Sequence, residues 1–276
     1  MIRVDAHHHV WQIARGDYGW LTPDLPIHRD YALHDLRPLL GDITATVLVQ
    51  AAPTTAETEF LLAVARQSGG LVRCVVGWTD LAHPDAPRRI AALMANPLLK
   101  GLRPMLQDIP DTDWVLGSDI QPALEALAAS GLRFDALIQP RHLPVLLQLH
   151  SRHPTLQSVI DHCAKPDIAG GAWQPWADDI ARVARETPAC CKLSGLATAA
   201  GRSWRVDDLR RYVDHLLGTF GPDRLMWGSD WPVVNLAGGY IRWRDAAASL
   251  LAGIPQRDRD AIFGGTALKF YGLMGY

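Results

Sequence analysis

Short apolar runs recur along the chain, and each has the length and the β-branched content of a buried strand. The first is apolar at Ile2, Val4 and Ala6. The later runs span residues 43–50, 71–78, 99–106, 133–138, 156–161, 189–193 and 224–227. The pattern therefore predicts eight strands.

Helical segments lie between most of these runs. Thr55 can cap one helix, and Pro84 suits the first turn of another. The predicted helices span residues 55–68, 84–95, 120–129, 143–150, 173–186 and 207–219, with two more near 239–251 and 256–273. Strands that alternate with helices, without a break in composition, predict an α/β protein: one (β/α)8 TIM-barrel domain over residues 1–276. A doubly wound parallel sheet is the alternative.

A long irregular segment, at about residues 11–37, follows the first strand and is rich in glycine and proline. A loop of this length in a compact protein is usually functional. We expect it to cover the barrel mouth, with Trp20 and His28 as the candidates to reach a site there.

The composition indicates a large core and little net charge. Of 276 residues, 48% are hydrophobic and 20% charged, and the net charge is −2. Because the chain has no basic stretch, neither nucleic acid nor an anionic membrane is expected as a partner. No apolar run reaches the roughly 18 residues of a membrane span, and the start lacks a signal peptide's features. We therefore expect a soluble, cytoplasmic protein.

Some other chemistries have no support in the sequence. The four cysteines lack metal-binding spacing, so buried free thiols are expected. No GxGxxG, Walker or GxSxG pattern occurs, which argues against nucleotide binding and against a serine nucleophile.

Three consecutive histidines end the first predicted strand. Residues two apart in a strand point the same way, so His7 and His9 share one face while His8 points to the other. Two adjacent imidazoles at a strand end are typical of a metal site or of a clamp that polarises a carbonyl. A surface cluster is the alternative; an expression tag would have no reason to follow a buried strand.

Polar residues also end the other predicted strands, and a barrel carries its chemistry at that face. Asp230 suits a general base or a metal ligand, or it only caps the next helix. His162 is either a third imidazole facing the first two or a core histidine. Arg103 and Lys192 either bind an anion or a carbonyl oxygen, or pair with nearby carboxylates. Tryptophans near strand ends can form the floor of a sugar-sized pocket.

Five segments resemble a known family when they are taken together in order. They are Asp5–Trp11, Lys100–Arg103, Ile160–Pro166, Cys191–Leu196 and Gly228–Pro232. The chain resembles, from about residue 3 to 271, the amidohydrolase-2 branch of the amidohydrolase superfamily. That branch contains sugar lactonases, such as L-fuconolactonase and L-rhamnonolactonase, and dicarboxylate lactonases.

The resemblance implies a hydrolase, on a distorted (β/α)8 barrel, that opens the ring of a small sugar-acid (aldono-) lactone. By analogy, Asp230 activates the attacking water, and His7, His9 and His162 complete the catalytic set. The same four residues would be the metal ligands. The expected substrate-binding residues are Arg103, Gln50, Trp78, Gln107, Lys192, Trp20 and Trp231.

The metal content and the substrate stay open at this point. No lysine ends the fourth strand to bridge two ions, so we expect one divalent metal, with zinc as the candidate, or none. Close sugar-lactonase relatives typically have histidine after the equivalent of Arg103, whereas this chain has Pro104. Substrate choice at that strand is therefore uncertain.

Three other functions are compatible with these residues. A metal-dependent decarboxylase of the same superfamily shares the paired histidines, His162 and Asp230. A dicarboxylate lactonase and a non-catalytic sugar-acid binder are the others. The expected partner is a small-molecule lactone, and the sequence leaves a homo-oligomer open.

Overall fold

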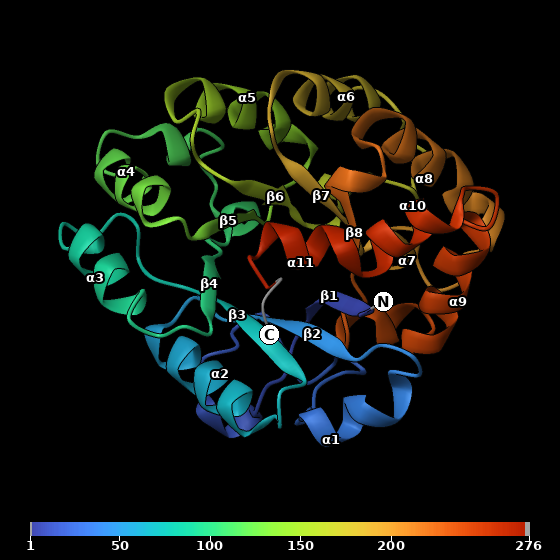
Figure 1. The fold of residues 1–276 in the computed structure, drawn as a ribbon, viewed down its shortest axis with the longest axis horizontal. Helices are drawn as coiled ribbons and strands as arrows, with labels where there is room; N and C mark the ends of the chain where they lie inside the picture. The colour runs from blue at the N-terminus through green and yellow to red at the C-terminus, as the bar shows by residue number, and fades with distance from the viewer. Residues whose placement is uncertain (1, 274–276) are drawn as a thin grey trace.

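Eight parallel strands form one sheet in the order β1 to β8 in the computed structural model, which describes residues 2–273 (Figure 1). The strands are β1 (Val4–His8), β2 (Ala45–Val49), β3 (Val72–Gly77), β4 (Leu99–Leu102), β5 (Arg133–Ala136), β6 (Ser158–Ile160), β7 (Cys190–Leu193) and β8 (Leu225–Trp227). A doubly wound sheet would reverse its strand order, and this one does not. The predicted (β/α)8 barrel is therefore confirmed.

The barrel is distorted where β1 meets β8. Among the described residues, the backbone of β1 bonds to the segment that follows β8, and no regular ladder joins these two strands. The Asp230 N–H donates to the His7 carbonyl at 2.8 Å, and the His9 N–H donates to the Trp231 carbonyl at 2.7 Å. The barrel thus closes at the carboxyl ends of its strands, beside the predicted site.

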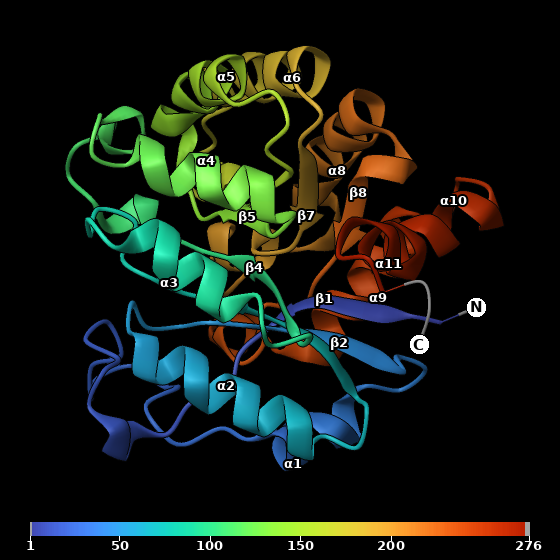
Figure 2. The ribbon, with the colours of Figure 1, turned by 60° about the vertical axis from the view of Figure 1, so that its left-hand side comes forward.

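Helices surround the strands as an outer ring, except α11, which lies across one end of the barrel (Figures 1 and 2). They are α1 (Leu33–Leu36), α2 (Thr55–Gln67), α3 (Ala86–Leu93), α4 (Gln121–Ser130), α5 (Leu143–Arg152), α6 (Trp176–Glu186), α7 (Leu196–Ala199), α8 (Val206–Phe220), α9 (Tyr240–Leu250), α10 (Gln256–Asp260) and α11 (Thr266–Phe270). The single helix predicted at 256–273 is wrong in detail, because a π-helical turn at Ala261–Gly265 separates α10 from α11. No helix among residues 2–273 is long and apolar enough to cross a membrane.

The helix α11 packs against the amino ends of the strands. The Arg133 side chain, at the start of β5, donates to the Phe270 carbonyl. Phe270 and Tyr271 share an apolar cluster with Val4, Ala45 and other inward-facing strand residues. Because α11 fills this end of the barrel, a ligand of the strand residues has to approach from the carboxyl end.

Candidate active site

The two outer histidines of β1 lie side by side, as the alternation of the strand predicts. The Nε2 atoms of His7 and His9 are 3.1 Å apart. The His8 ring points to the other face, where its Nε2 is 2.9 Å from the Thr46 hydroxyl. Gly228 lets His7 approach closely, since a Cβ at that position would be 2.6 Å from the Cβ of His7.

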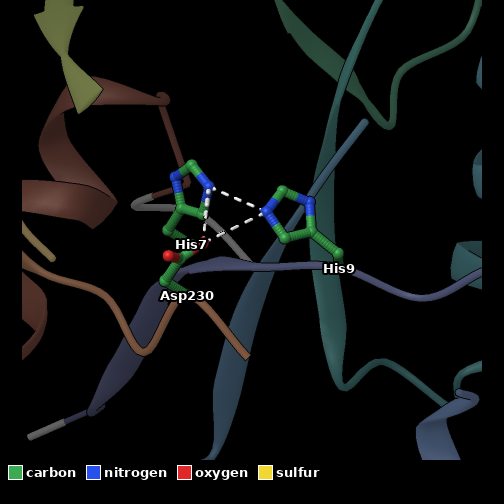
Figure 3. A group of neighbouring side chains, drawn as sticks. All are labelled: His7, His9 and Asp230. Atoms are coloured by element: carbon green, nitrogen blue, oxygen red, sulfur yellow. Dashed lines mark hydrogen bonds and ion pairs between the residues drawn. The ribbon is translucent and has the colours of Figure 1, made fainter. Parts of the chain in front are cut away.

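Asp230 and His162 complete a cluster with these two histidines. The Asp230 Oδ1 atom is 3.4 Å from His9 Nε2 and 3.8 Å from His7 Nε2 (Figure 3). His162 approaches the same oxygen with its Nε2 at 3.7 Å. Segments at the ends of β1, β6 and β8 therefore bring three imidazole nitrogens and one carboxylate oxygen together. We refer to His7, His9, His162 and Asp230 as the histidine–aspartate cluster.

Hydrogen bonds on the far side of each ring orient the cluster. His9 Nδ1 donates to the Val49 carbonyl at 2.8 Å, so the His9 Nε2 lone pair faces the cluster. His162 Nδ1 is 2.9 Å from the Ser194 hydroxyl. Gly195 next to Ser194 has a φ of +69°, and a Cβ there would be 2.5 Å from the His162 Cβ. Glycine at this position therefore gives His162 its room.

Burial and mutual charge set the protonation of the cluster. Burial lowers the pKa of His162 to about 4 and lowers the pKa of His7 well below its usual value. Burial alone would raise the pKa of Asp230, but the neighbouring imidazoles, His162 foremost, hold it below the usual value. Near neutral pH the His7 and His162 rings are thus neutral and the Asp230 carboxylate is ionised.

This donor set fits a zinc ion. Neutral imidazole nitrogen and carboxylate oxygen are typical zinc ligands. Two ligand atoms of a tetrahedral zinc ion lie roughly 3.3 Å apart, given bonds of about 2.0–2.1 Å. The separation of 3.1 Å between the two histidines of β1 and that of 3.4 Å between His9 and Asp230 are close to this value. A second grouping that could hold a metal ion consists of His7, Asp161 and His162. It shares His7 and His162 with the histidine–aspartate cluster.

A network of buried charges inside the barrel contacts the cluster. The Lys192 ammonium is 2.5 Å from Asp135 Oδ2 and 3.0 Å from Asp161 Oδ1. The Tyr271 hydroxyl donates to Asp135 at 2.7 Å, and the Arg103 guanidinium donates to Asp161 at 3.1 Å. We call Lys192, Asp135, Asp161 and Tyr271 the buried charge network.

The network touches the cluster at His7. The His7 Nδ1 atom lies 3.2 Å from the Lys192 ammonium and 3.4 Å from Asp161 Oδ1. Burial alone would raise the pKa of Asp161, but the positive charges around it, that of Lys192 foremost, keep it well below its usual value. Asp161 is therefore ionised, and together with Lys192 it holds one edge of the His7 ring.

A cavity of about 170 Å³ opens beside the cluster. Its size suits a ligand of about one sugar ring. It is lined by His9, Trp20, Ala51, Arg103, Met105, Gln107, Asp108, Leu137, His162, Lys165, Asp230 and Val233. Three of the seven predicted substrate-binding residues are in this set: Arg103, Gln107 and Trp20.

The other four predicted substrate-binding residues do not line the cavity, and three of them are engaged elsewhere. Lys192 is fully buried in the charge network. Gln50 exchanges backbone and side-chain hydrogen bonds with Arg103, and Trp231 packs edge-on against Tyr31. Trp78 also lies outside the lining.

The segment at residues 11–37 reaches the cavity through Trp20. The Trp20 indole N–H donates to the Ala51 carbonyl at 2.7 Å. Glu57, from α2, accepts hydrogen bonds from the N–H groups of Ala51 and Ala52 at 3.0 and 2.6 Å and so holds that wall. His28, the other candidate of the segment, is not among the lining residues.

Six lining residues were not selected from the sequence. Lys165 had a signal, because it follows the sixth predicted strand. Asp108, Met105 and Val233 lie in irregular segments or short turns beyond strand ends, where no local pattern indicates orientation. The remaining two are Ala51 and Leu137.

Two curated relatives and one solved structure resemble this chain over nearly its whole length. L-fucono-1,5-lactonase of Burkholderia ambifaria is 43% identical, with 98% of this chain and 95% of that protein covered. L-fucono-1,5-lactonase of Burkholderia multivorans is 35% identical, with 99% and 96% covered. A crystal structure of a Burkholderia multivorans amidohydrolase with bound zinc is 34% identical and has a TM-score of 0.92, with 99% of each chain covered.

These similarities agree with the family that the sequence motifs predict. The amidohydrolase family model matches residues 4–273, and the expected family is therefore confirmed. This protein belongs to the amidohydrolase family.

Proposed function

We propose that this protein hydrolyses the ring ester of a small sugar-acid lactone, with L-fucono-1,5-lactone as the first substrate to test. The observation that carries the proposal is the histidine–aspartate cluster, of which His9, His162 and Asp230 line a cavity of about 170 Å³. The names of both curated relatives support the same reaction. They do not favour the decarboxylase, the dicarboxylate lactonase or the non-catalytic binder.

We propose that His7, His9, His162 and Asp230 together hold one zinc ion. Their donor atoms and spacing support this, as does the zinc in the similar crystal structure. A zinc ion bound there would polarise the lactone carbonyl and lower the pKa of a water molecule.

The protein groups then have separate tasks. Asp230 is ionised at neutral pH, so it can accept a proton from the water that attacks the carbonyl carbon. Arg103 lines the cavity and is held by Asp161 and by the Gln50 carbonyl, which leaves it rigid for donating to a substrate oxygen. Trp20 offers an apolar face to the sugar ring.

Three further assignments belong to this proposal. The segment at residues 11–37 covers part of the mouth, supported by Trp20 in the cavity wall. Residues 1–276 act as one domain. A cytoplasmic location is supported by four free, buried cysteines, which suit a reducing compartment. A role in carbohydrate metabolism follows from the proposed sugar-lactone substrate.

The test is a pH-indicator assay of wild type and Asp230→Asn on L-fucono-1,5-lactone and a panel of other aldonolactones, with and without chelator. General bases contribute about 10²–10⁴-fold, so we expect Asp230→Asn to lose at least about 10²-fold in kcat. Asp214→Asn is the matched control, because Asp214 is exposed on α8 and does not line the cavity. An Asp230→Asn protein that is folded and retains the wild-type rate contradicts the assignment of the base.

A further inference from the structure

Four consecutive residues after β6 adopt the left-handed conformation. The φ angles of His162, Cys163, Ala164 and Lys165 are 53°, 54°, 58° and 52°. None of these is glycine, and each such residue costs about 1–2 kcal/mol. Backbone strain of this kind is retained where the surrounding structure enforces it, often at functional sites.

The surroundings of this turn hold it in place. The Trp176 indole N–H donates to the Cys163 carbonyl at 2.8 Å, and the Cys163 thiol contacts the Lys192 carbonyl at 3.2 Å. The Lys165 N–H closes the turn on the His162 carbonyl at 2.8 Å. Residues three apart in so tight a turn lie on one side, and both His162 and Lys165 line the cavity. The turn therefore presents a lysine beside a member of the histidine–aspartate cluster.

The Lys165 ammonium has spare hydrogen-bonding capacity. Its hydrogen-bond partner is the Gln107 side-chain oxygen, and an ammonium can donate three hydrogen bonds. Among residues 2–273, no carboxylate oxygen lies within 4.0 Å of it. Lys192, by contrast, contacts two carboxylates. Lys165 is thus a partly buried cation whose free donors face the cavity.

Both negative and positive side chains act on the Lys165 ammonium, and the negative ones are more numerous. Burial lowers the pKa of Lys165, the negative charges of Asp230, Asp108 and Asp161 act against this shift, and the positive charge of Arg103 adds to it. Asp230 has the largest effect among these charges, and both Asp230 and Lys165 line the cavity. A substrate placed for attack by a water at Asp230 therefore lies within the field of Lys165.

We propose that Lys165, held by Gln107, donates a hydrogen bond and then a proton to the ring oxygen that leaves the lactone carbonyl carbon. This inference rests on the proposed lactone hydrolysis and adds a second proton-transferring group to it. Negative charge develops on the ring oxygen only as the bond breaks. A donor placed at that oxygen therefore stabilises the transition state more than it stabilises the bound lactone.

The proposed step balances as follows. Water loses a proton to Asp230 and adds to the carbonyl carbon. The bond from that carbon to the ring oxygen then breaks, its electron pair stays on the ring oxygen, and the oxygen takes a proton from Lys165. The neutral amine recovers a proton from the new carboxylic acid, which leaves as a carboxylate, and Asp230 releases its proton to solvent.

The experiment compares wild type, Lys165→Met and Lys165→Arg on L-fucono-1,5-lactone, after subtraction of spontaneous hydrolysis. We expect Lys165→Met to lower kcat by about 10²–10³-fold and to change KM by less than about threefold. Lys269→Met is the matched control, because Lys269 is exposed on α11, and it should retain the wild-type rate.

The pH profile separates proton transfer from a structural role. Wild-type kcat should fall at alkaline pH as the ammonium deprotonates. Lys165→Arg should move that fall upward, since a guanidinium keeps its proton, and Lys165→Met should abolish it. If Lys165→Met does not fold, the shift between wild type and Lys165→Arg still decides the question.

Three results have distinct meanings. A wild-type protein without activity on any sugar lactone overturns the proposed function itself. An active wild type with Lys165→Met within about threefold of its kcat overturns only the role of Lys165. A variant that changes solely KM or the inhibition constant of the hydroxy-acid product also overturns it, because Lys165 would then bind the product carboxylate.

Discussion

Two lysines at strand ends differ in what surrounds their ammonium groups. Lys192, at the end of β7, is fully buried and lies between Asp135 and Asp161. Lys165, after β6, is partly buried, and within residues 2–273 its ammonium has one hydrogen-bond partner, the Gln107 amide oxygen in the cavity wall. A buried charge with its counter-ions supports structure, whereas a charge without them is available to a ligand. The comparison predicts that replacing one lysine affects mainly folding and replacing the other mainly turnover.

The largest effect on stability should follow from Lys192→Met. The substitution leaves Asp135 and Asp161 buried with less compensation, and breaking such a pair costs about 3–5 kcal/mol. Urea unfolding followed by circular dichroism measures the change. Lys165→Met is the comparison variant and should lose less than about 1 kcal/mol. Equal losses for the two variants would remove the distinction between these lysines.

Glu57, a buried carboxylate that forms no ion pair with any of residues 2–273, extends the comparison to acids. Glu57 accepts hydrogen bonds from backbone N–H groups, and burial raises its pKa to about 7. A raised pKa in the folded state means that the protonated form stabilises folding, and that this contribution is lost as pH rises through about 7.

The free energy of unfolding should accordingly fall between pH 5 and pH 8, by at most about 3 kcal/mol from this group. Glu57→Gln cannot titrate at this position, so its stability should depend less on pH. The difference between the two curves isolates Glu57 from other titrating groups. Parallel curves of unfolding free energy against pH would show that the backbone N–H groups stabilise the ionised Glu57 carboxylate as well as Lys192 stabilises that of Asp161.

The smallest effect should come from the edge of the buried charge network. Tyr271→Phe removes one hydrogen bond to Asp135 and should cost about 1.5–2 kcal/mol. A double-mutant cycle with Lys192→Met tests whether the two side chains act together. If the two losses of stability are strictly additive, the contribution of the Tyr271 hydroxyl to the free energy of unfolding does not depend on the charge state of Asp135.

Much of the fold was predictable because its signals are local. Apolar runs and amphipathic stretches placed the eight strands and most helices within a few residues. The alternation of side chains along β1 predicted that His7 and His9 face each other and that His8 points away. The final helix was mispredicted, because a π-helical turn interrupts α10 and α11 without a proline.

The candidate site was less predictable because direction at a strand end is not a local property. Lys192 lies near the end of β7 and Lys165 follows β6, yet Lys192 points into the barrel and Lys165 into the cavity. The orientation of Lys165 depends on a left-handed turn that Trp176, from α6, stabilises. Nothing in the residues His162–Lys165 indicates that conformation, since none of them is glycine.

The sequence by itself determined the barrel, the paired histidines and the order of polar residues at the strand ends. These features follow from the periodicity of hydrophobic residues, which is a property of neighbouring positions in the chain. Only the tertiary structure decided which of those residues share a cavity. Asp230 joins His7 because the segment after β8 closes the barrel against β1. Lys192 is withdrawn from the cavity because two distant carboxylates compensate its charge. Such contacts join residues far apart in the chain, and they form only once the barrel has closed.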